Sequence, residues 1–305
     1  MKIYKMKFYL FMLFWHYLAW QGQIMRYFVL RIWEESMSKV ALITGASRGI
    51  GRAIAYRFLQ KGIICVLVAR SETKLKEIGL QYPKSCFVYA CDLLQKRNLN
   101  ALTDFLQLHK LMPNIIIHCL GGHANNDKQP LSQEALIESV QLNLGASVAL
   151  NEVCIPYMQK KRDGHIIHIS SDCVLDGYSP PGYVAAKAAI NAYVKSSARF
   201  YAREGICFQS VMPGIINFKG SAWEKKSHTQ AYRIRKAHLA RGEFGTPDEV
   251  ASFVALLCES KNMLTSGAEF LLNGGGYIRA GDSFEPQEHL AYASCLDTFN
   301  LKSKE

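Results

Sequence analysis

Short apolar runs rich in β-branched residues alternate with longer amphipathic segments through most of the chain, starting near residue 40. Because the apolar runs show no polar alternation, they are typical of strands that are buried on both faces. Strands are predicted at 40–43, 63–69, 86–90, 114–119, 165–170, 206–211 and 269–272. Helices are predicted at 51–61, 73–82, 99–109, 132–157, 183–203 and 247–258.

The repeated succession of strand and helix predicts an α/β fold, a doubly wound, Rossmann-type parallel sheet flanked by helices. Nothing between residues 38 and 280 reads as a linker, so we expect one domain over 38–280. The more polar tail at 281–305 is typical of a loosely packed terminus.

Residues 1–36 differ from the rest of the chain, because early lysines precede a run of aromatic and aliphatic residues that ends near Trp20. No small-residue cleavage site follows this signal-like run, and it is shorter than the ~20 residues of a membrane span. Three interpretations stay open: an interfacial anchor, a signal-like segment that does not function as one, or an untranslated stretch before a true start at Met37.

The formal net charge of +11 suits nucleic acid or an acidic membrane surface, yet the chain has no nucleic-acid-binding motif. We therefore expect a soluble enzyme with an anionic cofactor, with no nucleic acid as partner, and with membrane contact only if residues 1–36 are present. The nine cysteines form no CxxC pair and no zinc-spaced cluster. This favours a reducing, cytoplasmic location and no metal site.

The segment Thr-Gly-Ala-Ser-Arg-Gly-Ile-Gly at 44–51 follows the first predicted strand and opens the first predicted helix. That context indicates a dinucleotide-binding turn. Gly45 allows the sharp turn, while Gly49 and Gly51 remove side chains where a pyrophosphate and the sheet approach. The helix N-terminus then offers N–H groups and a partial positive charge to phosphate.

The end of the second predicted strand indicates which cofactor to expect. A carboxylate there would hold the ribose 2′-hydroxyl of NAD(H), but the chain has Arg70. Arg48 adds a second guanidinium, and two arginines suit a 2′-phosphate, so NADP(H) is expected over NAD(H). The alternative is that Arg70 is only a solvated loop residue. Asp92, after the third strand, is expected to contact the adenine amino group, or else to cap a helix.

Tyr183 and Lys187 stand four residues apart and share one face of the predicted helix at 183–203. A tyrosine with an ordinary pKa of about 10 exchanges protons poorly at neutral pH. A neighbouring ammonium stabilises the phenolate and lowers that pKa. We expect Lys187 to lower the pKa of Tyr183 and to hold the hydroxyls of the nicotinamide ribose.

Ser171 and Asn143 are further candidates for the proton-transfer set. Ser171 follows the fifth predicted strand, where its hydroxyl could bond the substrate oxygen beside the phenol, whereas Ser170 should point to the opposite face. Asn143 lies within the predicted helix at 132–157. It is either a satisfied polar core group or the holder of a water that relays protons toward Lys187.

Together these residues resemble the short-chain dehydrogenase/reductase family over about 38–278, most closely its 3-oxoacyl-acyl-carrier-protein reductases, with support from segments 244–250 and 273–275. The resemblance implies a seven-stranded sheet, a homodimer or homotetramer, and a catalytic set of Asn143, Ser171, Tyr183 and Lys187. The expected cofactor contacts are Gly45, Ser47, Arg48, Gly49, Ile50, Gly51, Arg70, Asp92, Leu93, Gly121, Tyr183, Lys187, Pro213, Gly214 and Ile216.

The chain departs from the family's pattern near the substrate and cofactor. The segment 118–122 (His-Cys-Leu-Gly-Gly) replaces the usual Asn-Ala-Gly, and Phe218 stands where a threonine commonly contacts the carboxamide. Asn273 replaces an aspartate, and the loop between Ser171 and Tyr183 is one residue shorter than the family's.

Residues 219–241, at the place of the family's substrate lid, carry an excess of basic side chains. They would attract an anionic substrate, such as a phosphopantetheine thioester or a nucleotide-linked sugar, unless they form only a solvated helix face. The expected activity is NADPH-dependent, reversible interconversion of a ketone and a secondary alcohol, with a 3-oxoacyl thioester as one candidate. The alternatives are a sugar or specialised-metabolite ketone, or a non-catalytic NADP(H)-binding sensor or scaffold.

Overall fold

The structure, a computed structural model, describes residues 39–237, 239–259 and 262–276. The described residues from Val40 onward belong to one compact unit. The extension predicted at 1–36, the alternative start at Met37 and the tail predicted at 281–305 lie outside the described residues. In the described part of the chain, none of the helices has the length and apolar character needed to cross a membrane.

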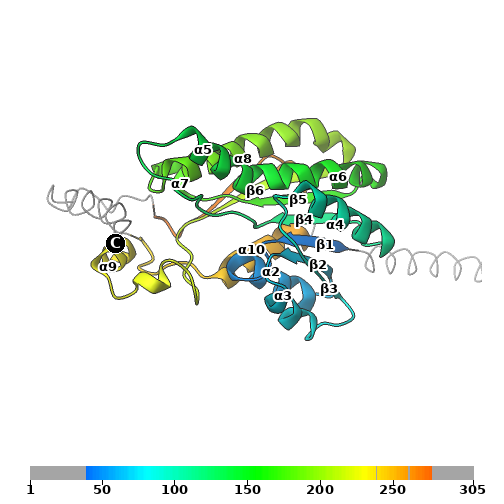
Figure 1. Ribbon diagram of the computed structural model, residues 1–305, viewed down its shortest axis with the longest axis horizontal. Helices are drawn as coiled ribbons and strands as arrows, with labels where there is room; N and C mark the ends of the chain where they lie inside the picture. The colour runs from blue at the N-terminus through cyan, green and yellow to red at the C-terminus, as the bar shows by residue number, and fades with distance from the viewer. Residues whose placement is uncertain (1–38, 238, 260–261, 277–305) are drawn as a thin grey trace, which may run out of the picture. The chain divides into compact units, whose positions relative to one another are not determined.

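Seven parallel strands form one sheet in the order β3-β2-β1-β4-β5-β6-β7 (Figure 1). The predicted fold class is therefore confirmed, and each predicted strand is present. The strands are β1 (Val40–Thr44), β2 (Ile64–Ala69), β3 (Cys86–Ala90), β4 (Ile115–His118), β5 (Gly164–Ile169), β6 (Ile206–Pro213) and β7 (Glu269–Leu272).

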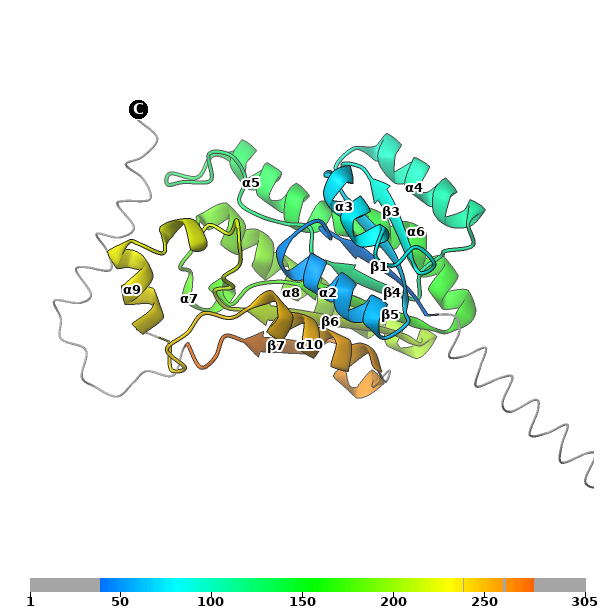
Figure 2. The same cartoon turned by 90° about the horizontal axis from the view of Figure 1, so that it is seen from below.

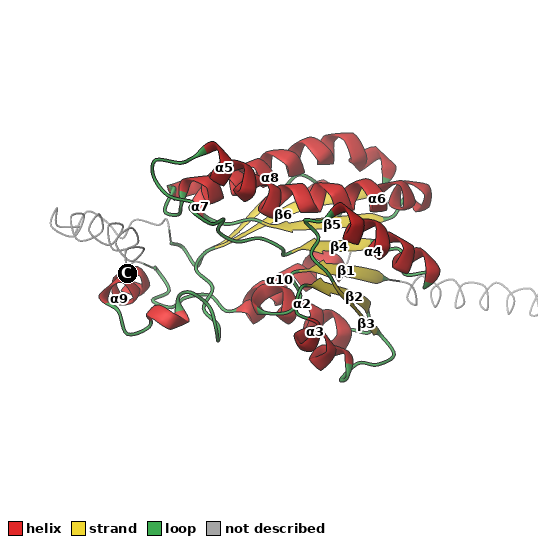
Figure 3. Cartoon of the chain, viewed as in Figure 1, coloured by secondary structure: helices red, strands yellow, loops and turns green. Residues whose placement is uncertain are grey.

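Helices cover both faces of the sheet (Figures 1 and 2), and Figure 3 shows the strands between the two helical layers. One layer consists of α2 (Gly49–Gln60), α3 (Glu72–Gly79) and α10 (Pro247–Glu259). The other consists of α4 (Lys96–Leu108), α6 (Ala146–Lys161) and α8 (Pro181–Tyr201). Shorter helices follow the carboxyl ends of three strands: α5 (Gln133–Val140), α7 (Cys173–Asp176) and α9 (Gln230–Ala237).

Each face of the sheet has its own apolar core. Phe58 of α2 and Val254 of α10 are buried on one face, and Ile190 of α8 packs with Phe208 of β6 on the other. Burying a large apolar side chain stabilises the fold by about 1.5–3 kcal/mol. These cores hold α2 and α8, the helices that carry the glycine-rich turn and Tyr183, against the sheet.

The helix predicted at 132–157 is interrupted. α5 ends at Val140, and a π-helical turn at Gln141–Gly145 joins it to α6. Asn143 lies in this turn, which is a form often found at functional sites. α6 then continues to Lys161, beyond the predicted end, although Pro156 lacks the N–H that a helix interior normally uses.

The strand order reverses between β1 and β4, which lie side by side although β2 and β3 intervene in the sequence. Thr44 and His118 end these two strands and are paired in register. In open α/β sheets, ligands bind outside the carboxyl ends of the strands at such a switch point. A ligand site is therefore expected at the segments that follow Thr44 and His118.

Candidate active site

The glycine-rich turn is held tightly between β1 and α2. A Cβ on Gly51 would lie 2.6 Å from the carbonyl oxygen of Gly45, and a Cβ on Gly45 would lie 2.8 Å from that of Cys119. Gly45 also has a φ of 65°, which favours glycine. The neighbouring backbone therefore leaves no room for side chains at Gly45 and Gly51.

The segment after β4 is fastened to the same turn. The hydroxyl oxygen of Thr44 accepts hydrogen bonds from the backbone N–H groups of Cys119 and Leu120, each at 3.1 Å. This segment, which departs from the family's usual Asn-Ala-Gly, is thus held by Thr44 at the end of β1. Its next residue, Gly121, lies near Asn143 and Lys187.

Phe218 packs directly on the glycine-rich turn. Its ring carbon Cζ lies 2.7 Å from the position that a Cβ on Gly49 would take. The aromatic ring, which stands where the family commonly has a threonine, therefore covers the backbone of Gly49. The contact was not predictable, because it joins residues far apart in the chain.

Two guanidinium groups, Arg48 and Arg70, are exposed near the ends of β1 and β2. The ends lie together, because Ala46 N donates to the carbonyl oxygen of Val68 at 3.3 Å. Asp92 accepts a hydrogen bond from Leu94 N at 3.1 Å in a local turn; it does not cap α4, whose N-cap position is Gln95.

The other predicted cofactor contacts are distributed along the carboxyl edge of the sheet. Ser47 and Ile50 lie in the glycine-rich turn, Leu93 is buried after β3, and Pro213 ends β6. Gly214 and Ile216 line a cavity of about 280 Å³ that Arg241 and Asn273 also line. A Cβ on Gly214 would lie 3.1 Å from Oδ2 of Asp172, the residue after Ser171.

Lys187 is almost fully buried one helical turn after Tyr183 on α8, with 4% of its surface exposed. Its Nζ donates a hydrogen bond to the carbonyl oxygen of Ile169 at 2.9 Å and lies 5.4 Å from the centre of the Tyr183 ring. Burial lowers the pKa of Lys187 to about 8, while the thiols of Cys173 and Cys119 act in the opposite direction.

The pKa of Tyr183 is raised above its ordinary value, and burial of the phenol is the main cause. The side chain of Cys173 raises this pKa further, and a hydrogen bond with Ser171 lowers it. The prediction that Lys187 gives Tyr183 a lowered pKa is therefore wrong for this structure, because desolvation outweighs any stabilisation of the phenolate. The phenol is held in its protonated form.

The two serines that follow β5 make hydrogen bonds to different residues. The Ser170 hydroxyl is buried and donates to the carbonyl oxygen of Lys187 at 3.2 Å. The Ser171 side chain acts to lower the pKa of Tyr183 through hydrogen bonding, and its Oγ accepts a hydrogen bond from Cys173 N at 3.2 Å. Alternation along the strand thus places Ser171, and not Ser170, beside the phenol.

Asn143 joins the π-helical turn to the segment after β4. Its Nδ2 donates to the carbonyl oxygens of Gly122 and Ser139, both at 2.9 Å, and its Oδ1 accepts from Gly122 N at 3.0 Å. Both amide hydrogens are therefore in use. Any water bound by this side chain would have to bond the second lone pair of Oδ1.

Two side chains of the β4–α5 loop contact the tyrosine region without having been predicted. The ring of His123 lies 4.5 Å from that of Tyr183, centre to centre, and is tilted by 42°. The carboxylate of Asp127 accepts hydrogen bonds from the backbone at the start of α8. Neither residue belongs to a recognisable motif, so neither could be identified from the sequence.

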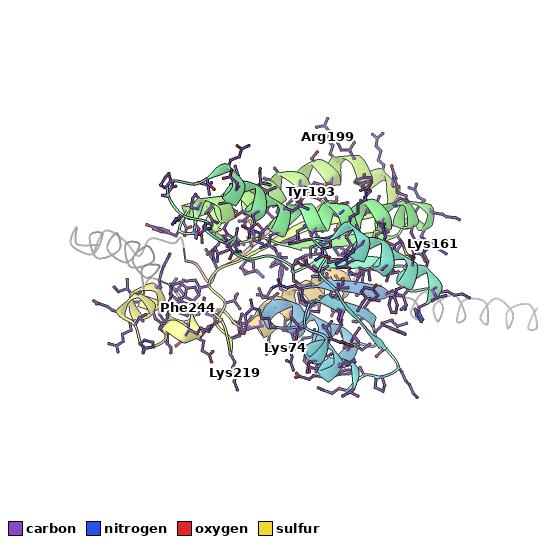
Figure 4. The ribbon with its side chains drawn as sticks, viewed as in Figure 1. Lys74, Lys161, Tyr193, Arg199, Lys219 and Phe244 are labelled. Carbon is purple, nitrogen blue, oxygen red and sulfur yellow. The ribbon has the colours of Figure 1, made fainter. Side chains whose placement is uncertain are left out.

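The basic lid, residues 219–241, combines paired and exposed cations. Lys236 and Arg241 each pair with a glutamate at 2.7 Å, Glu243 and Glu249 respectively. The exposed basic side chains are Lys219, Lys225, Arg233 and Arg241. An aromatic cluster supports the lid, with Tyr232 and Trp223 at 4.8 and 5.4 Å from Phe244; Figure 4 shows Phe244 beside α9 and Lys219 below it.

Comparison with known proteins gives a consistent result. The family model described as short chain dehydrogenase matches residues 39–230. The chain is 30% identical over 240 residues to a 3-oxoacyl-acyl-carrier-protein reductase of Rickettsia bellii, which covers 78% of this chain and 96% of the relative. It is 30% identical over 206 residues to an uncharacterized oxidoreductase of Staphylococcus epidermidis, covering 65% of this chain and 88% of the relative.

A solved structure extends the similarity to the fold. L-sorbose reductase of Gluconobacter frateurii, in complex with NADPH and L-sorbose, is similar with a TM-score of 0.70 and 26% sequence identity. The match covers 78% of this chain and 95% of that one.

Proposed function

Since the chain belongs to the short-chain dehydrogenase/reductase family, and is thus an oxidoreductase acting on CH–OH or carbonyl groups, we propose that it interconverts a ketone and a secondary alcohol with NADP(H). Tyr183 is the proton donor in reduction and the acceptor in oxidation. The cysteine pattern supports a cytoplasmic location, and the family supports a homodimer or homotetramer. One observation carries the proposal: Tyr183, Ser171 and the buried Lys187 meet beside the end of β5.

The residues present fit the cofactor provided that the Phe218 ring, which covers the backbone of Gly49, moves aside when the pyrophosphate binds. The glycine-rich turn has no space for Cβ atoms at Gly45 and Gly51, which suits close approach of a pyrophosphate. The N-terminus of α2 offers its first N–H groups to phosphate. Arg48 and Arg70 would hold the 2′-phosphate of NADP(H), since guanidinium groups bind phosphate bidentately. When bound, NADPH supplies the hydride that reduces the carbonyl carbon.

Tyr183, Ser171 and Lys187 carry out the proton transfer that accompanies the hydride transfer. The protonated phenol of Tyr183 donates its proton to the carbonyl oxygen as a general acid. Ser171 donates a hydrogen bond to the same oxygen while negative charge develops on it. With a pKa of about 8, Lys187 remains mostly cationic at neutral pH and lies 5.4 Å from the Tyr183 ring, where its charge offsets part of the cost of the tyrosinate left after transfer, although burial keeps the pKa of Tyr183 raised. In oxidation, that tyrosinate removes the proton from the alcohol.

For the substrate, the basic lid supports an anionic 3-oxoacyl thioester as the first candidate. Several of its cations are exposed to solvent, where they would steer an anionic substrate toward the site. The similarity to L-sorbose reductase supports a sugar ketone as the second candidate. Oxidation of saturating NADPH with an acetoacetyl thioester of an anionic carrier and with a ketohexose would separate the two, because only the kcat/KM of the thioester should fall markedly as salt is added.

The Tyr183→Phe variant tests the chemistry. We expect turnover to fall by about 10²–10⁴-fold, because the general acid is removed. The dissociation constant of NADPH should stay close to wild type, since the glycine-rich turn is unchanged. Turnover near the wild-type value, with any active ketone, would remove Tyr183 from the mechanism.

A further inference from the structure

The helix that carries Tyr183 and Lys187 receives its cap from a distant part of the chain. α8 begins at Pro181, and its N-cap residue, Pro180, makes no side-chain capping bond. The first N–H groups of a helix have no partner within the helix. Here Asp127, in the loop between β4 and α5, accepts hydrogen bonds from the backbone N–H groups of Gly182 and Tyr183, both at 2.8 Å.

The packing around this carboxylate is specific. A Cβ on Gly182 would lie 2.9 Å from Oδ1 of Asp127 and 2.7 Å from Oγ of Ser139. A side chain at this position would force the carboxylate and the Ser139 hydroxyl to shift away from the start of α8. Ser139 Oγ donates a further, longer hydrogen bond to Oδ2 of Asp127 at 3.4 Å. The negative charge also lies at the positive end of the helix dipole of α8.

The same loop contacts the tyrosine side chain. His123, four residues before Asp127, places its ring 4.5 Å from the ring of Tyr183. The loop thus holds Tyr183 at two points, through its backbone N–H and through its aromatic ring. A shift of the loop would therefore move the phenol relative to Ser171, which comes from a different element, the end of β5.

We propose that Asp127 is a positioning residue for proton transfer: by capping α8 across the chain, it sets the place of Tyr183 relative to Ser171 and Lys187. The proposal rests on the proposed function, since it gives Tyr183 the role of proton donor. Misplacement of a reacting group by about 1 Å can cost about 10²-fold in rate. The effect should appear in kcat and leave cofactor binding intact, because the glycine-rich turn belongs to other elements.

The test compares Asp127→Ala, Asp127→Asn and Gly182→Ala with the wild type in a ketone-dependent NADPH-oxidation assay. We expect Asp127→Ala to lower kcat by about 10- to 100-fold while the dissociation constant of NADPH changes by less than about twofold. Asp127→Asn keeps one acceptor oxygen and should recover part of that loss. Gly182→Ala should lower kcat like Asp127→Ala, since its Cβ would displace the carboxylate.

The matched control is Ser132→Ala, which removes the cap of the neighbouring helix α5, where Ser132 Oγ accepts from Ala135 N at 3.2 Å. It should lower the melting temperature slightly and leave kcat unchanged. If Asp127→Ala is too unstable to assay, Asp127→Asn and Gly182→Ala decide the question. Folded Asp127 and Gly182 variants with wild-type kcat would overturn the proposal, as would a loss of kcat in Ser132→Ala equal to theirs.

The Tyr183→Phe variant, measured in parallel, separates this proposal from the function on which it rests. If that variant keeps its activity, Tyr183 is not the proton donor and the proposed function fails. If it is inactive while the Asp127 variants turn over normally, the proposed function stands and the positioning role of Asp127 fails.

Discussion

Arg70 follows β2 with its guanidinium in solvent, and the end of that strand adjoins the glycine-rich turn. The next acidic residue along the chain, Glu72, pairs with Lys76 at 2.7 Å. A ribose bound at this strand end would therefore meet a cation first. That arrangement supports the choice of NADP(H), whose 2′-phosphate needs a positive partner.

Arg70→Ala should weaken NADPH binding about tenfold or more, since hydrogen bonds to charged groups contribute about 1.5–3 kcal/mol. NADH binding should be nearly unchanged, because NADH lacks the 2′-phosphate. Fluorescence titration of both cofactors provides the measurement. The control is Arg199→Ala, which removes an exposed guanidinium from the far end of α8. Equal losses for NADH and NADPH would assign Arg70 no role in the preference.

For single residues, the sequence predicted the position of some site side chains but not the pKa or the partners of others. The choice of Ser171 over Ser170 followed from strand alternation, a local rule, and the structure places Ser171 beside Tyr183. The raised pKa of Tyr183 could not be predicted, since desolvation depends on the whole surrounding fold. Asp127 was missed because its partners, Gly182 and Tyr183, lie more than fifty residues away.

At the scale of elements, the turn between β1 and α2 has little room for side chains. Gly51→Ala would place a Cβ 2.6 Å from a backbone oxygen, which cannot move as a side chain can. We expect a loss of about 1–3 kcal/mol in the free energy of unfolding, together with weaker NADPH binding. Urea unfolding followed by fluorescence would measure the first effect and cofactor titration the second.

Gly79→Ala is the matched control for that change. Gly79 ends α3, where a Cβ would lie 3.4 Å from Cγ1 of Val88, an ordinary contact distance. Alanine is favoured over glycine in helices by up to about 1 kcal/mol, so stability should hold or rise. A Gly51→Ala protein as stable as the Gly79→Ala protein would show that the turn has room that the structure does not indicate.

Elements with a clear apolar pattern were predicted well, and those without one were not. The helix at 132–157 was found, but its π-helical turn was not, because hydrophobic spacing does not reveal a single inserted residue. α9 was missed since none of its described residues is buried, so it carries no apolar stripe to detect.

At the scale of the whole domain, two buried histidines lie between the sheet and the α6–α8 layer, and each has a ring nitrogen without a hydrogen-bond partner among the described residues. The rings of His118 and His168 lie 4.4 Å apart, and both side chains are buried. His118 bonds Asn151 at 2.9 Å, while both ring nitrogens of His168 lack a hydrogen-bond partner in the described residues. Burial lowers the pKa of His118 to about 4, and burial, with His118 and Lys187, holds the pKa of His168 well below its usual range.

These histidines should make the fold sensitive to acid. Below a pH of about 6.5, these histidines bind protons in the unfolded chain but stay neutral in the folded protein. The free energy of unfolding therefore falls as the pH drops toward 4. Each histidine should contribute about 1.4 kcal/mol per pH unit in that window. Urea unfolding at several pH values should show a shallower dependence for His168→Leu than for wild type, whereas replacing the exposed His109 should not change it. Identical slopes in all three proteins would contradict this account.

The fold as a whole was predictable from the alternation of buried strands and amphipathic helices, because that alternation admits few topologies. The alternation does not specify which side chains meet across the sheet. The proximity of His118 and His168 follows from the register of β4 on β5. Both residues were part of predicted strands, yet only the paired register shows that their rings lie against each other.

α2 and α10 pack side by side in one helical layer. Two side-chain hydrogen bonds join them, from Arg57 to Ser252 at 2.7 Å and from Lys61 to Glu259 at 2.6 Å. Arg57 and Ser252 are 195 residues apart in the chain. On a ribosome, α2 therefore emerges long before its covering helix has been translated. Until then the apolar core that Phe58 shares with α10 is incomplete, so we expect a polypeptide that ends before residue 247 to expose apolar surface and to aggregate.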